Sequence, residues 1–214
     1  MKYLKMIGLP AVAAMVLMAF VGAGTASATV LCSTNVAPCP AGQKWPTGTE
    51  LRFTVRPGGA GVWTTTSGEP FAKCPEGEIR GKITNSGSAT ETVQTSVEAS
   101  GFTWPGAEEC IKTVTVEGGT LELHTIVGTN NATVTVSGFK ITFNTIFFGS
   151  CTYGFGTGAD FGDLTANGSG SAILDINTVF VKKEGGFICP ESLKWTEQFT
   201  QEKPSGTALY VKSS

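Results

Sequence analysis

The stretch from Glu50 to Thr65, ELRFTVRPGGAGVWTT, contains the pattern that decides the fold. Leu51, Phe53 and Val55 alternate with polar residues, which is the two-residue period of a strand with one buried face. A Pro-Gly-Gly turn at 57–59 ends this run, and a second run begins at Val62. The stretch therefore predicts two successive strands separated by a turn.

The same rhythm continues through the rest of the chain. Nine further segments have strand character: Ile79–Thr84, Glu91–Glu98, Ile111–Val116, Thr120–Val127, Ala132–Val136, Lys140–Phe148, Ser171–Val181, Leu193–Thr200 and Ala208–Lys212. Turns rich in glycine and asparagine separate several of them, and no stretch has helical spacing over three turns. Such a series is typical of an antiparallel sandwich, jelly roll or barrel. We expect an all-β fold of about 10–12 strands, arranged as an antiparallel β-sandwich or jelly roll and stapled by disulfides.

Composition excludes several classes of protein. The chain has 214 residues, 41% hydrophobic and 15% charged, with a net charge of -2. It is too apolar for wholesale disorder, and its charged content is too low for a coiled coil. Because the chain has no basic excess to neutralise a phosphate backbone, we expect no nucleic-acid partner.

The first 28 residues have the features of a signal peptide. Lys2 and Lys5 precede an uncharged, apolar run from Met6 to Val21, and Ala26-Ser27-Ala28 fits the small-x-small cleavage rule. The apolar run is shorter than the ~20 residues that span a bilayer. We therefore expect residues 1–28 to be removed, leaving a secreted protein of the extracellular space or cell envelope with no membrane span.

Six cysteines form an even set: Cys32, Cys39, Cys74, Cys110, Cys151 and Cys189. In an exported chain they predict three disulfides, and we expect the sequential pairing Cys32–Cys39, Cys74–Cys110 and Cys151–Cys189 because hairpin-rich folds keep sequence neighbours adjacent. Their spacing lacks the close pairs of a zinc site. Residues 29–49 are expected to form an irregular arm closed by the first disulfide, and residues 50–214 a single β domain.

The sequence offers few groups for catalysis. The one histidine, His124, shares a strand face with Glu122, but no Gly-x-Ser-x-Gly nucleophile motif occurs. Carboxylate pairs such as Glu76 with Glu78 lie in turn-prone segments, where solvated charges are expected. We expect no catalytic residues and no cofactor.

A glycine-rich segment, residues 154–163, has weak calcium-binding character. Asp160 and Asp163 could supply hard oxygen ligands from a loop freed to turn by its glycines. The segment occurs only once, whereas calcium-binding β-rolls repeat it. Asp160 and Asp163 are therefore weak Ca²⁺ candidates.

The tryptophans are the remaining candidates for ligand contact. Trp63 and Trp195 lie within strand patterns, which favours the core, whereas Trp45 and Trp104 precede prolines in predicted loops. Exposed rings at Trp45 and Trp104 could stack on sugar rings. Extracellular or cell-surface glycans are therefore possible partners, and a carbohydrate-binding or carbohydrate-cleaving module is the alternative function.

The C-terminal part of the chain carries a resemblance. Cys189-Pro190-Glu191, the segment Lys194–Thr200 (KWTEQFT), Pro204 and Leu209-Tyr210-Val211 together resemble a group of secreted, cysteine-containing β-rich proteins from actinobacteria. The Cys32–Cys39 loop and the strand start at Gly48-Thr49 are similar too. The resemblance implies a bacterial envelope or extracellular setting, and it carries over no functional residue. The sequence as a whole predicts an exported, non-enzymatic surface, matrix or binding protein.

Overall fold

The computed structural model describes residues 28–74, 76–103, 111–145, 149–166, 171–204 and 208–213, so the predicted signal peptide lies outside the described residues except for Ala28. The described chain is all-β, as predicted, with one short 3₁₀ helix at Ala41–Gln43. Its strands are β1 (Thr29–Cys32), β2 (Glu50–Val55), β3 (Gly61–Thr65), β4 (Pro70–Cys74), β5 (Glu78–Asn85), β6 (Val93–Thr103), β7 (Ile111–Glu117), β8 (Thr120–Thr125), β9 (Ala132–Ser137), β10 (Lys140–Thr145), β11 (Gly149–Gly154), β12 (Ala159–Thr165), β13 (Ile173–Glu184), β14 (Ser192–Lys203) and β15 (Tyr210–Ser213).

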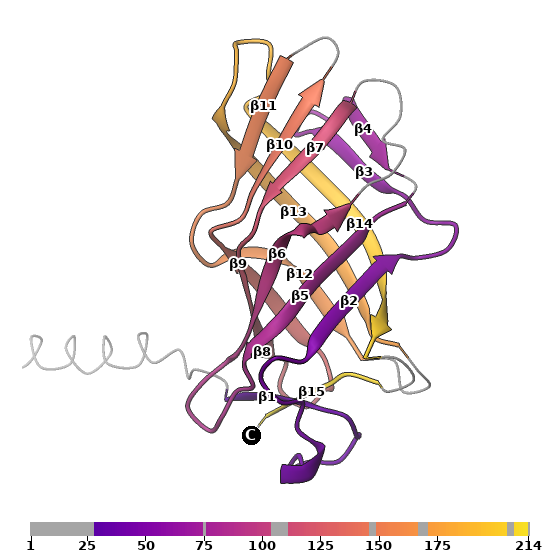
Figure 1. The fold of residues 1–214 in the computed structure, drawn as a ribbon, viewed down its shortest axis with the longest axis vertical. Helices are drawn as coiled ribbons and strands as arrows, with labels where there is room; N and C mark the ends of the chain where they lie inside the picture. The colour runs from indigo at the N-terminus through magenta and orange to yellow at the C-terminus, as the bar shows by residue number, and fades with distance from the viewer. Residues whose placement is uncertain are drawn as a thin grey trace, which may run out of the picture.

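Eight of these strands close into an antiparallel barrel (Figure 1). Their order is β14-β2-β5-β6-β8-β9-β12-β13, and β13 pairs back onto β14 from Ile173↔Thr200 to Val181↔Ser192. The expectation of a sandwich or jelly roll was therefore wrong. Alternating apolar residues bury one face of a strand equally well in either architecture, whereas the closing pair is a long-range contact that the pattern does not contain.

The two longest strands extend beyond the barrel and carry a second sheet. The N-terminal half of β14 pairs with β3, which pairs with β4. The C-terminal end of β13 pairs with β11, which leads through β10 to β7. The upper part of the molecule in Figure 1 is thus a sheet in the order β4-β3-β14-β13-β11-β10-β7 that shares its two central strands with the barrel.

A two-stranded ribbon of β1 and β15 lies at the other end of the barrel. Leu31 and Val211 of this ribbon, together with Leu209 just before β15, are buried in the main core. The predicted irregular arm at 29–49 therefore begins with a strand, and that strand contributes to the core of the β domain. Strand alternation does not reveal this pairing, because β1 is only four residues long and its partner lies at the other end of the chain.

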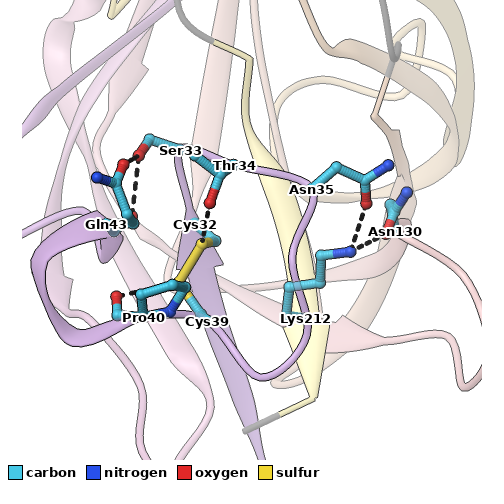
Figure 2. Close-up of a disulfide and its surroundings, with 9 residues drawn as sticks. All are labelled: Cys32, Ser33, Thr34, Asn35, Cys39, Pro40, Gln43, Asn130 and Lys212. Atoms are coloured by element: carbon cyan, nitrogen blue, oxygen red, sulfur yellow. Dashed lines mark hydrogen bonds between the residues drawn. A yellow bond between two sulfur atoms is a disulfide. The ribbon is translucent and has the colours of Figure 1, made fainter.

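A buried lysine fastens this ribbon to its surroundings, as Figure 2 shows. Lys212 Nζ donates to Asn35 Oδ1 at 2.6 Å and to Asn130 Oδ1, which lies in the turn after β8. Burial lowers the pKa of Lys212, since a charged ammonium loses water there. The two amide oxygens offset that loss and hold β15 against both the N-terminal loop and the β8–β9 turn.

Two of the three predicted disulfides are confirmed. Cys32–Cys39 closes the N-terminal loop in Figure 2, and Cys151–Cys189 links β11 to the loop between β13 and β14. The predicted Cys74–Cys110 pair falls on Cys110, which lies outside the described residues.

Candidate binding cavity

The lower half of the barrel interior is lined by aliphatic side chains around unfilled space. Each barrel strand turns alternate residues inward, and the ribbon adds Leu31 and Leu209 from below. The cavity they surround has a volume of about 30 Å³, which is room for a water molecule and must widen to take a larger ligand. Its lining residues are Leu31, Leu51, Phe53, Thr95, Leu121, Leu123, Val134, Leu164, Leu174 and Leu209.

A second space adjoins the first. Its volume is also about 30 Å³, and the two linings share Leu51, Phe53, Thr95, Leu121 and Leu174. Gly81 forms part of this second wall, where a Cβ atom would collide with the Ser96 carbonyl oxygen. The glycine therefore allows β5 and β6 to approach closely at this point.

The upper half of the interior is filled instead by aromatic rings. Trp63 and Trp195 are completely buried, which confirms their predicted core positions, and their rings stack with centroids 4.7 Å apart. Phe143 meets Trp63 edge-on at 4.9 Å, and Phe180 lies 5.2 Å from it. Close packing of large rings leaves the lower, mostly aliphatic half as the part of the barrel that side chains fill incompletely.

A carboxylate lies inside the barrel beside this aromatic cluster. Glu197 is only 4% exposed, and its Oε2 accepts a hydrogen bond from Trp195 Nε1 at 2.8 Å. Gly61 on β3 lies against it, so closely that a Cβ there would collide with the carboxylate. Glu197 was not among the predicted site residues, although strand alternation puts it on the same face as Trp195 and Phe199.

A second buried polar group lies on β11. The Tyr153 hydroxyl is fully buried and has no hydrogen-bond partner among the described residues. Burial, with a smaller contribution from the negative charge of Glu191, raises the pKa of Tyr153 to about 12. Neither Tyr153 nor Glu197 lines the aliphatic cavity.

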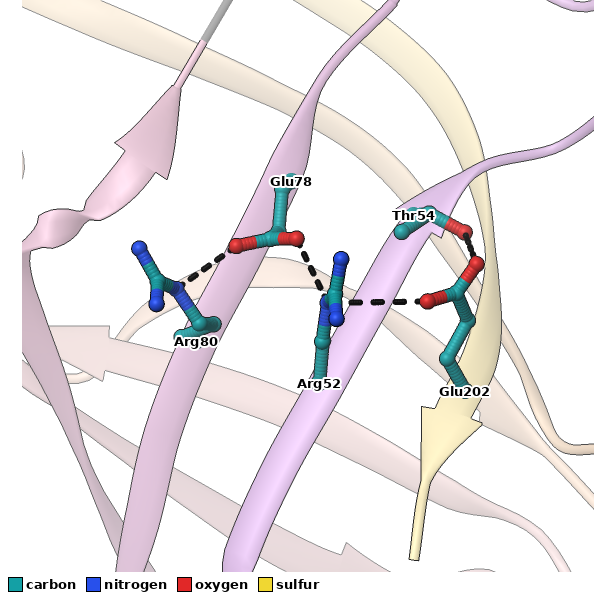
Figure 3. A network of polar contacts seen from close by, with 5 residues as sticks. All are labelled: Arg52, Thr54, Glu78, Arg80 and Glu202. Carbon is teal, nitrogen blue, oxygen red and sulfur yellow. Dashed lines mark hydrogen bonds and ion pairs between the residues drawn. The ribbon is translucent and has the colours of Figure 1, made fainter. Parts of the chain in front are cut away.

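The outer barrel surface carries a chain of ion pairs, shown in Figure 3. Glu78 accepts from Arg52 Nε at 2.5 Å and pairs with Arg80 Nε at 2.6 Å, and Arg52 also lies 3.5 Å from Glu202. Glu78, one member of a carboxylate pair considered for catalysis, is thus bound by two guanidinium groups. This arrangement ties β2, β5 and β14 together on the solvent side.

The other polar candidates also lie on the outside of the barrel. His124 Nε2 is 3.0 Å from Thr135 Oγ1 and 3.9 Å from Glu122 Oε2, on a partly exposed face. Asp160 and Asp163 are both exposed on β12, which is a strand rather than the expected loop. Within the described ranges, no group of three His, Cys, Asp or Glu side chains is placed to hold a metal ion.

The two tryptophans chosen for ligand contact differ in what the structure describes. Trp45 is partly buried, packs against the barrel core, and donates its backbone N–H to the Leu31 carbonyl. Its indole Nε1 is buried without a hydrogen-bond partner among the described residues. Trp104 lies outside the described residues.

Comparison with known proteins identifies no relative of this chain. The chain matches no family model, no curated protein and no solved structure. In the described part of the chain, no helix has the length and apolar character needed to cross a membrane.

Proposed function

We propose that the chain is an exported, non-enzymatic binding protein that holds a small apolar molecule in the lower half of its barrel. The observation that carries the proposal is the incompletely filled apolar interior lined by Leu31, Leu121, Leu174 and their neighbours, which would widen as an apolar ligand enters. Eight-stranded barrels have an interior that side chains just fill or that holds one small ligand.

The lining selects the chemistry of the ligand. Nine of its ten residues, all but Thr95, have purely hydrocarbon side chains. Water is poorly held in such a space because it finds few hydrogen-bond partners there. Each buried methylene of a ligand contributes about 0.8 kcal/mol. A hydrocarbon or the apolar part of a lipid therefore fits better than a sugar or a charged metabolite.

Export is supported by the N-terminal sequence and by the disulfides. Residues 1–28 have the pattern of a signal peptide, and two disulfides are compatible with an oxidising compartment. A carbohydrate-binding function has weaker support, since Trp45 is partly buried and packs against the core.

Benzene is the probe that tests the cavity. We expect benzene to shift the backbone amide NMR signals of residues lining it and to raise the melting temperature of the protein. Leu121→Phe places extra volume in both spaces and should weaken benzene binding at least about tenfold, since filling the site removes its room. Ile126→Phe, just beyond β8 at a partly exposed position, is the matched control and should bind as wild type does.

A second variant keeps the test sharp if Leu121→Phe fails to fold. Thr95→Val keeps the shape of the lining but removes its hydroxyl, so benzene should bind as tightly or a few-fold more tightly. The proposal is wrong if wild-type protein shows no benzene-dependent shift, or if Leu121→Phe binds benzene as well as Ile126→Phe does.

A further inference from the structure

The loop between β13 and β14, which a disulfide anchors, exposes a phenylalanine side chain. Phe187 is 96% exposed and Ile188 is 44% exposed. The Cys151–Cys189 disulfide anchors the loop to β11, and Cys189 N–H donates to the Gly186 carbonyl across the turn. Phe187 is therefore exposed to solvent in a loop whose conformation is fixed by a disulfide and a backbone hydrogen bond.

The apolar surface continues from this tip along the outside of β13. Val179 and Val181 are 45% and 51% exposed, since Phe180 between them turns into the core. We call Val179, Val181, Phe187 and Ile188 the tip surface. Four exposed apolar side chains at one end of a strand hairpin, two on the face of β13 and two in the loop that follows it, indicate a contact made with another body.

Lysines border the tip surface. Lys194 lies directly opposite Val179 in the β13–β14 register, and Lys183 follows on β13. Both are exposed, and neither forms an ion pair with any described residue. Lys182 is already paired with Glu191, and Glu184 is the other acid of this hairpin end. Free cations thus gather beside the exposed apolar residues of a chain whose net charge is -2.

We infer that the tip surface docks on an anionic lipid bilayer. A protruding phenylalanine gains free energy when it enters the boundary between headgroups and acyl chains, and lysine ammonium groups beside it reach anionic headgroups. The convex shape of a hairpin tip suits a deformable lipid surface. This inference is independent of the ligand cavity, which lies in the other half of the barrel.

Vesicle sedimentation tests this docking. The wild-type protein should sediment with equimolar phosphatidylglycerol and phosphatidylcholine vesicles, less with pure phosphatidylcholine, and less again at high salt. Phe187→Ser should weaken sedimentation about tenfold, as expected for losing the burial of one aromatic ring. The double variant Lys183→Glu, Lys194→Glu should weaken it by at least that factor on anionic vesicles only.

Val127→Ser is the matched control. Val127 is 84% exposed in the β8–β9 turn, next to the ribbon at the opposite end of the barrel, and its substitution should leave sedimentation unchanged. Equal sedimentation of Phe187→Ser and Val127→Ser would overturn the inference, as would a wild-type protein that ignores anionic vesicles. Self-association without lipid that Phe187→Ser abolishes would assign the tip surface to a second copy of the chain and overturn it too.

Discussion

The buried hydroxyl of Tyr153 affects the unfolding free energy of the protein. The Tyr153 ring lies near Phe71 and Phe143, with ring centroids 6.4 and 6.0 Å apart, and its buried hydroxyl has no hydrogen-bond partner in the described chain. Desolvating a hydroxyl without a partner costs free energy. We therefore expect Tyr153→Phe to leave the unfolding free energy at pH 7 unchanged or to raise it by about 1 kcal/mol.

The same residue predicts a pH dependence. The pKa of Tyr153 is about 12 in the folded state and near 10 in the unfolded state. Between pH 10 and 12 the unfolded chain therefore releases a proton that the folded chain retains, so stability present below pH 10 is lost as pH rises. The expected loss is on the order of 2 kcal/mol.

Urea unfolding at pH 9, 10 and 11 measures this loss. Wild-type protein should lose more stability over that range than Tyr153→Phe, whereas Tyr210→Phe on β15 should follow wild type. Parallel stability curves for wild type and Tyr153→Phe would show that the hydroxyl is not held protonated by burial.

Gly61 and Glu197 should be energetically coupled. Gly61→Ala would press a methyl group against the buried carboxylate and should destabilise the protein by about 1–3 kcal/mol. Adding Glu197→Ala removes the colliding group, so the double variant should cost less than the sum of the two single ones. Chemical denaturation of all four proteins measures the coupling, with Gly42→Ala, where nothing lies within 4 Å, as a neutral control. Simple additivity would contradict the contact.

At the level of single strands, alternation predicted most elements but missed four of them: β1, β4, β11 and β12. The glycines of residues 154–163 made Asp160 and Asp163 weak calcium candidates, yet Gly162 allows close packing of two strands, since a Cβ there would collide with the Asp175 carbonyl of β13. Glycine at a close approach and glycine in a loop are identical in sequence. Only the distance to the neighbouring strand in the folded structure distinguishes the two.

The two disulfides should differ in their contribution to stability. Cys151–Cys189 spans 38 residues and Cys32–Cys39 spans 7. The chain-entropy model gives about 4 kcal/mol for the longer link and about 2–3 kcal/mol for the shorter one. Replacing Cys151 and Cys189 by alanine should therefore lower the unfolding free energy more than replacing Cys32 and Cys39.

Limited proteolysis provides a second measurement on the same variants. The Cys151→Ala, Cys189→Ala protein should be cleaved faster within residues 185–191, where the tip loses its anchor. Equal cleavage of both double variants at this loop would show that backbone hydrogen bonds alone hold it.

For the whole molecule, the cavity should lower the pressure at which the protein unfolds. Internal space that disappears on unfolding makes a folded protein sensitive to pressure. We expect Leu121→Phe, which fills part of both spaces, to unfold at higher pressure than wild type, and Ile126→Phe to unfold at the wild-type pressure. Intrinsic tryptophan fluorescence under pressure measures the midpoint. Identical midpoints for all three proteins would show that the spaces close without cost.

The features that the sequence predicts are local ones, and the features that it does not predict depend on contacts between distant parts of the chain. The all-β class and two disulfide pairs come from local patterns and from the order of the cysteines. The barrel and its cavity depend on β14 meeting both β2 and β13, and on Leu31 and Leu209 meeting from distant parts of the chain. Strand alternation shows which residues turn inward, but not what they face.

The β1–β15 ribbon at the base of the barrel also determines when folding can finish during synthesis or export. β1 pairs with β15 from Thr29↔Ser213 to Cys32↔Tyr210, so the first described strand to leave a ribosome or a translocation channel waits for the last. Until then Leu209 and Val211 are absent from the floor of the barrel. A chain that threads through a channel N-terminus first would therefore have an open base during its passage, and a hydrophobic molecule present at that moment could be enclosed as the final strand arrives.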